Sequence, residues 1–322
     1  MQIARLSRQA LYLASALTAQ AIPVFSHVAR ELTTLNLLKS VFISAFVTWL
    51  AVVSLYALIQ LTRGTEPLLS WLGLAFSALA PLSFFIKAFV AKSARTPRHP
   101  VEFSVLGSLG LAITMAMSYR YDQAAGLIHV WAAVTLVLWL IYLRWYSVFH
   151  DRDAQSLRVG SDLPEFRLES LEGHPVSSQS FKAKPHILLF YRGNWCPFCT
   201  AQIEELAVSY RQLEEKGFNV VLISSQSQKK NQALATRFDV PMIFLMDRDN
   251  AAAKQLGISH KWGTPMGMQL LGYGSDTVLP TVILTNSEGR IIYTDQTDNY
   301  RVRPEPGFYE SILKEKTQEL PG

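Results

Sequence analysis

Four long apolar runs without Asp, Glu, Lys or Arg dominate the first half of this 322-residue chain. They cover residues 41–61, 68–86, 103–119 and 123–143. A helix needs about 20 apolar residues to cross the hydrocarbon core of a bilayer, and each run comes close to that length. We therefore predict that residues 1–150 form a helical membrane domain with about four transmembrane helices. The third run is the shortest and contains glycine, so a buried helix of a soluble protein is its alternative interpretation.

The positive charges around these runs predict how the helices are oriented. Cytoplasmic connections of membrane proteins carry an excess of Lys and Arg. Only Arg63 and Arg120 lie in the connections after the first and third runs. Apart from Lys87, which directly follows the second run, the other flanks hold Arg5, Arg8, Arg30, Lys39, Lys92, Arg95, Arg98, Arg144, Arg152 and Arg158. We expect a multi-pass protein of the plasma membrane, in contact with the lipid bilayer, whose C-terminal half faces the cytoplasm.

The first 30 residues have two interpretations. An amphipathic helix that lies on the membrane surface is the one we favour. The alternative is a cleaved signal peptide, because Arg5 and Arg8 precede a modest apolar stretch and Ala19-Gln20-Ala21 has the small residues of a cleavage site. A cleaved signal would change the count of spans and could place the C-terminal half outside the cell.

The charge balance changes along the chain. Residues 1–160 have 13 Lys or Arg against 6 Asp or Glu, whereas residues 161–322 have 17 against 19. The basic excess flanks apolar runs instead of forming one concentrated positive face, so we expect no nucleic-acid partner. His129 is the only histidine inside the runs, which contain no cysteine. We therefore expect the first half to act as an anchor and to bind no cofactor. We also expect a second domain to cover residues 159–322.

The chain has only two cysteines, Cys196 and Cys199. The continuous apolar run 186–191 before them predicts a strand buried on both faces, and residues 200–216 have the apolar stripe of an amphipathic helix. The pair therefore lies where a strand turns into a helix, and Pro197 suits the first helical turn. Unpaired backbone N–H groups there favour a thiolate. We expect Cys196, at the exposed start, to have the lower pKa and to attack, and Cys199 to lie deeper as the resolving thiol.

Two other interpretations of the cysteine pair remain open. The pair could be half of a zinc site, but zinc takes four ligands, and the chain offers no second cysteine pair and only scattered histidines. We therefore expect no metal. The pair could also be chemically inert. Its position at the start of a helix makes this interpretation as unfavourable as the zinc site.

Four segments of the second half resemble, in order and spacing, the AhpC/TSA group of peroxiredoxin-like (redoxin) proteins. They are GSDLPEFRL, LLFYRGNWCPFCTAQIEEL, FLMDRDNAAAKQLGI and LPTVILTNSEGRIIY. The resemblance covers roughly residues 159–315 and implies a thioredoxin fold, which agrees with the β-α-β-α-β-α-β-β order of the elements that the sequence predicts. We expect an α-helical membrane domain followed by an α/β domain with a mixed sheet and helices on both faces.

The resemblance permits two alignments of the cysteine pair. Against thioredoxins, WCPFC matches a WCxxC site, so that Cys196 attacks, Trp195 and Pro197 support it, and Pro280 corresponds to the cis-proline that faces such sites. Against peroxiredoxins, Cys199 takes the peroxidatic position, Cys196 replaces a threonine and Arg192 replaces a proline.

The resemblance implies an antioxidant oxidoreductase that reduces hydroperoxides through a dithiol–disulfide cycle, and the apolar runs of the first half predict that it is anchored in a membrane. An external thiol, either thioredoxin-like or of low molecular weight, would then restore the dithiol. The alternatives are thiol–disulfide exchange on protein disulfides and a non-catalytic redox-sensing membrane module. We expect Arg301 and Arg303 to be solvated or paired without stabilising a thiolate, and Asp247 to be a turn residue.

Overall fold

The computed structural model describes residues 33–120, 126–149, 152 and 155–304. Four helices in these ranges are long and apolar enough to cross a membrane, namely Thr33–Thr62, Leu68–Val90, Val101–Tyr119 and Leu127–Tyr146. The four expected helices are therefore present, and their crossing of a bilayer stays a prediction. Both interpretations of the first 30 residues concern a segment outside the described residues.

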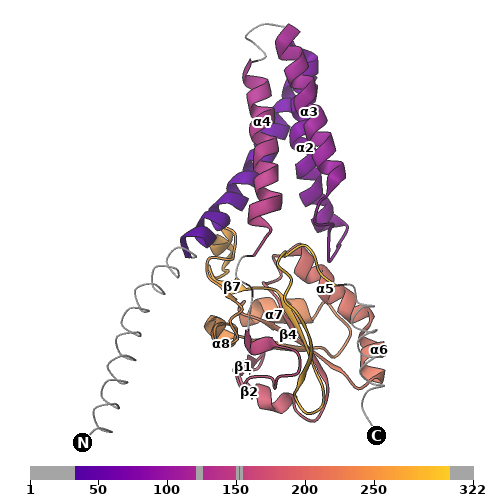
Figure 1. Ribbon diagram of the computed structural model, residues 1–322, viewed down its shortest axis with the longest axis vertical. Helices are drawn as coiled ribbons and strands as arrows, with labels where there is room; N and C mark the ends of the chain where they lie inside the picture. The colour runs from indigo at the N-terminus through magenta and orange to yellow at the C-terminus, as the bar shows by residue number, and fades with distance from the viewer. Residues whose placement is uncertain (1–32, 121–125, 150–151, 153–154, 305–322) are drawn as a thin grey trace, which may run out of the picture.

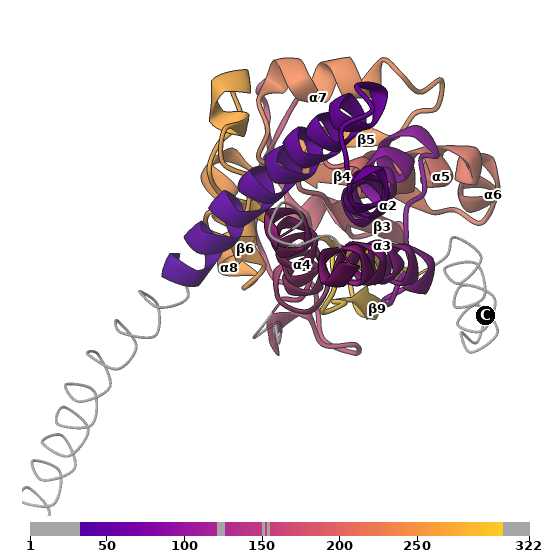
Figure 2. The same cartoon turned by 90° about the horizontal axis from the view of Figure 1, so that it is seen from above.

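The helices form an elongated bundle that stands on a compact α/β domain (Figure 1). In the view from above, α2 (Leu68–Val90), α3 (Val101–Arg120) and α4 (Gly126–Ile141) are seen nearly end-on. Helix Thr33–Thr62 is tilted against these three. It begins beside the α/β domain and rises along the bundle (Figure 1), so it looks oblique in the view from above (Figure 2). A π-helical turn, η2 (Tyr142–Tyr146), ends the bundle on the side of that domain.

Glycines allow α2 and α3 to approach closely. A Cβ atom on Gly73 would lie 2.7 Å from the carbonyl oxygen of Gly110, and a Cβ atom on Gly110 would collide with Gly73 and Ser77. Small residues at helix interfaces let backbones pack closely in membranes. Glycine in the third apolar run therefore serves helix packing.

The α/β domain is built on a seven-stranded mixed sheet with the strand order β2-β1-β5-β4-β3-β8-β9. The strands are β1 (Arg167–Ser170), β2 (Pro175–Ser177), β3 (His186–Phe190), β4 (Asn219–Ser224), β5 (Ile243–Met246), β8 (Thr281–Thr285) and β9 (Ile291–Asp295). β6 (Ser259–His260) and β7 (Thr277–Val278) form a separate two-stranded sheet. The helices are α5 (Pro197–Val208), α6 (Tyr210–Glu215), α7 (Gln228–Ala235) and α8 (Ala251–Gln255). This is the thioredoxin-like architecture that we expected after a helical region.

β3 lies inside the sheet because its residues are apolar on both faces. All five of its residues are buried. It pairs in parallel with β4, where Leu189 is opposite Leu222, and antiparallel with β8, where Leu189 is opposite Val282. The predicted buried strand is confirmed, and its carboxyl end leads directly to the cysteines.

The tail at residues 299–303 joins the α/β domain to the bundle. The hydroxyls of Tyr300 and Tyr142 share a hydrogen bond of 2.7 Å. Arg301 is fully buried and donates to Ser147 Oγ at 3.0 Å and to Thr96 Oγ1 at 2.8 Å. Its guanidinium also lies 5.6 Å from the ring of Tyr142. Because a buried charge needs such partners, these contacts tie the tail firmly to the bundle.

Candidate active site

The cysteine pair lies at the turn from β3 to α5. Cys196 is the N-cap of α5, with extended backbone angles (φ −92°, ψ 111°), and Pro197 follows as the first helical residue. The backbone N–H of Cys199 donates to the carbonyl of Cys196 at 3.0 Å. The predicted strand–turn–helix placement is therefore confirmed. Pro197 has the position where its missing N–H costs no helical hydrogen bond.

Both thiols are free and buried, with Cys196 1% exposed and Cys199 fully buried. The hydrogen bond to Cys199, together with burial, raises the pKa of Cys196 well above its ordinary value. Burial also tends to raise the pKa of Cys199, but the hydrogen bond from Cys196 and the charge of Arg303 hold this pKa well below the ordinary value. These pKa directions, together with the charge of Arg303, favour Cys199 as the thiolate of the pair.

Arg303 is the cation that stabilises this thiolate. Its Nη2 donates to Cys199 Sγ at 3.4 Å, and its Nε donates to the carbonyl of Tyr300 at 3.2 Å. Its Nη1 donates to Gln202 Oε1 on α5. Since the guanidinium is buried, its attraction for a thiolate is weakly screened.

Two expectations about this site are therefore wrong. We expected Cys196 to have the lower pKa because it begins the helix, and we expected no thiolate-stabilising part for Arg303. The helix start does favour an anion, but a direct contact with a buried cation outweighs the difference of one helical turn. Arg303 lies 104 residues from Cys199 in the sequence, so no local pattern could identify this contact.

Arg192 is a second buried cation beside the pair. It is 5% exposed, its Nη2 donates to the carbonyl of Gly263, and its Nε has no partner among the described residues. Its guanidinium lies 4.7 Å from the ring centroid of Trp195 and 5.5 Å from that of Tyr300. Trp195 therefore covers a cation next to the cysteines.

Pro280 does not have the conformation that the thioredoxin alignment required. Among the described residues the only cis peptide bond precedes Pro67, so the bond before Pro280 is trans, which is contrary to the thioredoxin alignment of the pair. The carbonyl of Pro280 accepts from Arg152, which also donates to Thr281 Oγ1 at 2.8 Å. Pro280 is not among the residues that line the cavity at Cys196.

Asp247 has a structural task, as we expected. Its carboxylate accepts from the backbone N–H groups of Ala252 at 2.8 Å and Ala253 at 2.9 Å, at the start of α8. Such contacts satisfy donors that a helix leaves unpaired.

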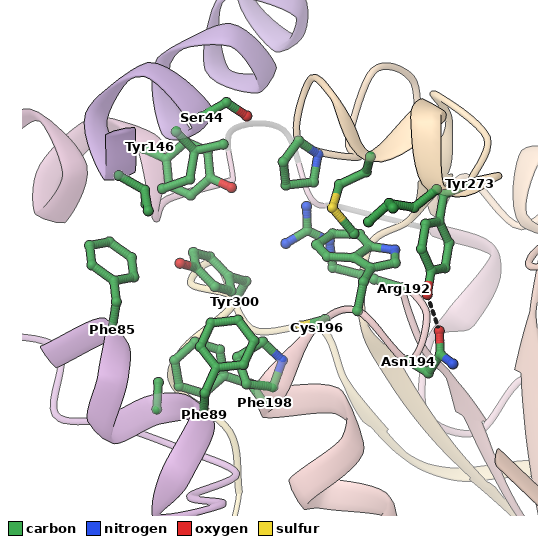
Figure 3. A pocket seen from close by; sticks show the side chains of 18 of the residues that line it. Ser44, Phe85, Phe89, Tyr146, Arg192, Asn194, Cys196, Phe198, Tyr273 and Tyr300 are labelled. Atoms are coloured by element: carbon green, nitrogen blue, oxygen red, sulfur yellow. Dashed lines mark hydrogen bonds between the residues drawn. The ribbon is translucent and has the colours of Figure 1, made fainter. Parts of the chain in front are cut away.

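A cavity of about 630 Å³ ends at Cys196. One wall comes from the bundle and the other from the α/β domain, and the labelled side chains of both walls face each other across it (Figure 3). Trp195, Pro197 and Phe198 line it together with Cys196, whereas Cys199 is behind them. The arrangement thus places one sulfur at the cavity wall and the thiolate next to it.

Comparisons with known proteins identify the family of the C-terminal half. The model of the AhpC/TSA family matches residues 159–294. The chloroplastic peroxiredoxin Q of Sedum lineare is 36% identical over 111 residues, which are 34% of this chain and 60% of that protein. The putative peroxiredoxin bcp of Coxiella burnetii is 33% identical over 103 residues, 32% of this chain and 68% of that protein.

Among solved structures, the peroxidoxin BcpB of Mycobacterium tuberculosis matches with a TM-score of 0.41 and 18% identity, over 52% of this chain and 99% of that one. The chain spans about 60% of the length of the Sedum relative and 51% of a peroxiredoxin Q from Triticum aestivum. It spans more than two thirds of the Coxiella relative. The chain therefore belongs to the AhpC/TSA family.

Proposed function

We propose that this chain is a membrane-anchored thiol peroxidase of the peroxiredoxin type. Residues 1–150 would anchor it in the plasma membrane, and residues 159–322 would carry out the reaction on the cytoplasmic side. The observation that carries the proposal is the contact between Arg303 and the Cys199 thiolate. The relatives that are named peroxiredoxins support it.

The reaction begins at Cys199. Its thiolate attacks the terminal oxygen of a hydroperoxide, so that an S–O bond forms and the O–O bond breaks. The alkoxide that leaves takes the proton of Cys196, and Cys199 becomes a sulfenic acid. The thiolate of Cys196 then attacks this sulfur and displaces hydroxide, which leaves a disulfide and an alcohol. An external thiol of low molecular weight, which can enter the cavity that Cys196 lines, must reduce the disulfide by exchange.

The burial of Cys196 argues against protein disulfides as substrates. Thiol–disulfide exchange needs access of one sulfur to another, and Cys196 is only 1% exposed, at the end of an apolar cavity. A peroxide can enter such a cavity more easily than a folded protein can. Peroxide reduction is therefore the function that we favour over exchange with proteins.

Two single-cysteine variants of the full chain test the proposal. After one equivalent of hydrogen peroxide and trapping with dimedone, mass spectrometry should find a sulfenic acid on Cys199 in the Cys196→Ser variant. The Cys199→Ser variant should remain unlabelled, because its remaining thiol has no cation in hydrogen-bond contact. Label on Cys196 alone would reverse the assignment, and no reaction of the wild type would refute the peroxidase function.

A further inference from the structure

The cavity at Cys196 is built by two parts of the chain that are far apart in sequence. The bundle contributes apolar side chains from helix Thr33–Thr62 and from the end of α2, such as Val47 and Phe89. The α/β domain contributes aromatic side chains, including Phe198 and Tyr273 (Figure 3). Its volume of about 630 Å³ lies within the range of roughly 300–1,000 Å³ typical of ligand pockets. Hydrogen peroxide alone needs no apolar chamber of this size.

The mouth of the cavity continues onto the outer face of the bundle. A second hollow of about 520 Å³ runs along helix Thr33–Thr62 and shares Ser44 and Thr48 with the cavity. Val41 and Val52 line this hollow and are exposed on the helix surface. If the helix spans the bilayer, this surface meets lipid, because only apolar side chains face the hydrocarbon without cost. The apolar path thus leads from lipid to the dithiol.

A loop of the α/β domain forms a fixed wall of this path. Ser40 Oγ donates to the carbonyl of Thr264, and Ser44 Oγ donates to the carbonyl of Met266, both at 2.6 Å. The backbone N–H of Met266 donates back to the carbonyl of Ser40 at 3.0 Å. Beyond this clamp Met266, Leu270 and Leu271 are all exposed, and a group of exposed apolar side chains is typical of contact with a membrane or partner.

The lining of the cavity includes one charged side chain. Arg192 lines the cavity beside Cys196, and its buried Nε lacks a partner among the described residues. A buried donor without an acceptor is costly, so a ligand oxygen there would be stabilised. The cavity thus combines one cationic donor at the sulfur with a long apolar remainder.

We propose that this cavity binds an acyl chain of a membrane lipid that carries a hydroperoxide. The proposal rests on the peroxidase function above. The chain enters along helix Thr33–Thr62, and Arg192 holds the hydroperoxide beside Cys196, the sulfur that lines the cavity. Cys199 forms a hydrogen bond with Cys196, and the terminal peroxide oxygen displaces this contact to meet the Cys199 thiolate. The thiolate of Cys199 then breaks the O–O bond, Cys196 resolves the sulfenic acid, and the lipid leaves as its alcohol with one hydroxide. A thiol donor reduces the disulfide as before.

A substitution at the mouth tests the path. In wild type and variant reconstituted into phosphatidylcholine nanodiscs, kcat/KM is measured for phosphatidylcholine hydroperoxide and for hydrogen peroxide. Thr48→Trp should fill the mouth and lower the ratio of the two constants at least tenfold. Leu55→Trp is the matched control, since Leu55 lies two turns further on the same exposed face, lines neither hollow and should leave the ratio unchanged.

The lipid path would be overturned if Thr48→Trp changes the ratio of the two kcat/KM values less than twofold while the wild type still reduces hydrogen peroxide. The peroxidase function would then remain. Failure of the wild type to reduce either peroxide would refute both. Lipid occupancy has an independent test that needs no turnover. Phosphatidylcholine with a diazirine on its acyl chain should cross-link the wild type within 194–198 or 268–273. Labelling confined to the outer faces of the helices would refute the site.

Discussion

Removal of Arg303 is the perturbation that tests the chemistry of the site most directly. The guanidinium donates to Cys199 Sγ at 3.4 Å, and both groups are buried. In Arg303→Gln the charge is lost while a side chain that can still bond to its neighbours remains. We expect Cys199 to lose its anionic character, because burial then opposes the thiolate without a cation to offset it.

The magnitude follows from the kind of contact. A hydrogen bond to a charged group contributes about 1.5–3 kcal/mol, and about 1.4 kcal/mol corresponds to a factor of ten in an equilibrium. The thiolate-to-thiol ratio of Cys199 at a given pH should therefore fall by about 10- to 150-fold. Arg303→Lys keeps the charge without the planar fork and should cause a smaller loss.

The assay is the rate of alkylation by iodoacetamide as a function of pH, in the Cys196→Ser background so that one sulfur reacts. In the Cys196→Ser background a serine hydroxyl can replace Cys196 as the hydrogen-bond donor to Cys199, and the charge of Arg303 remains. We therefore expect the pKa of Cys199 to stay below its ordinary value and the reference rate to vary little around neutral pH. In Arg303→Gln the rate should be low at neutral pH and rise as the pH is raised. Arg248→Gln, which removes an exposed arginine paired with Glu169, serves as the control. Equal profiles with and without Arg303, in folded protein, would refute the reasoning.

Two further predictions concern the bundle. Gly110→Ala should destabilise the packing of α2 against α3 by about 1–3 kcal/mol, as overpacking does, whereas Gly107→Ala should be tolerated because its Cβ would meet nothing closer than 3.9 Å. Thermal unfolding in detergent separates the two, and equal midpoints would contradict this account. Alkaline phosphatase fused after residue 158 should be inactive and a cytoplasmic reporter active, since the basic flanks predict a cytoplasmic C-terminal half.

Local patterns were sufficient to predict the elements that place the cysteines. Residues 187–191 after His186 form a short apolar run, which is typical of a strand buried on both faces, and β3 has that position. The four apolar runs likewise became four long helices. Both features depend on neighbours in the sequence, so periodicity and length are enough to recognise them.

The electrostatics of the site depend on contacts that no local pattern contains. The helix start favours Cys196 if only α5 is considered, but Arg303 comes from 104 residues away to contact Cys199. The cavity is a similar case, because Val47 and Phe198 meet only after the bundle has packed on the α/β domain. The trans bond before Pro280 shows that a motif shared with thioredoxins does not carry their proline geometry with it.

The tail at residues 299–303 explains why the bundle matters for the chemistry. Tyr300 bonds to Tyr142, and Arg301 is buried against the connection between α2 and α3 through Thr96 and the carbonyls of Pro97 and Arg98. Two residues later the same tail delivers Arg303 to Cys199. A cation stabilises a thiolate only while its own position is fixed, since a mobile side chain would leave for water. The helices therefore supply the support that keeps Cys199 ionised, in addition to a wall of the cavity.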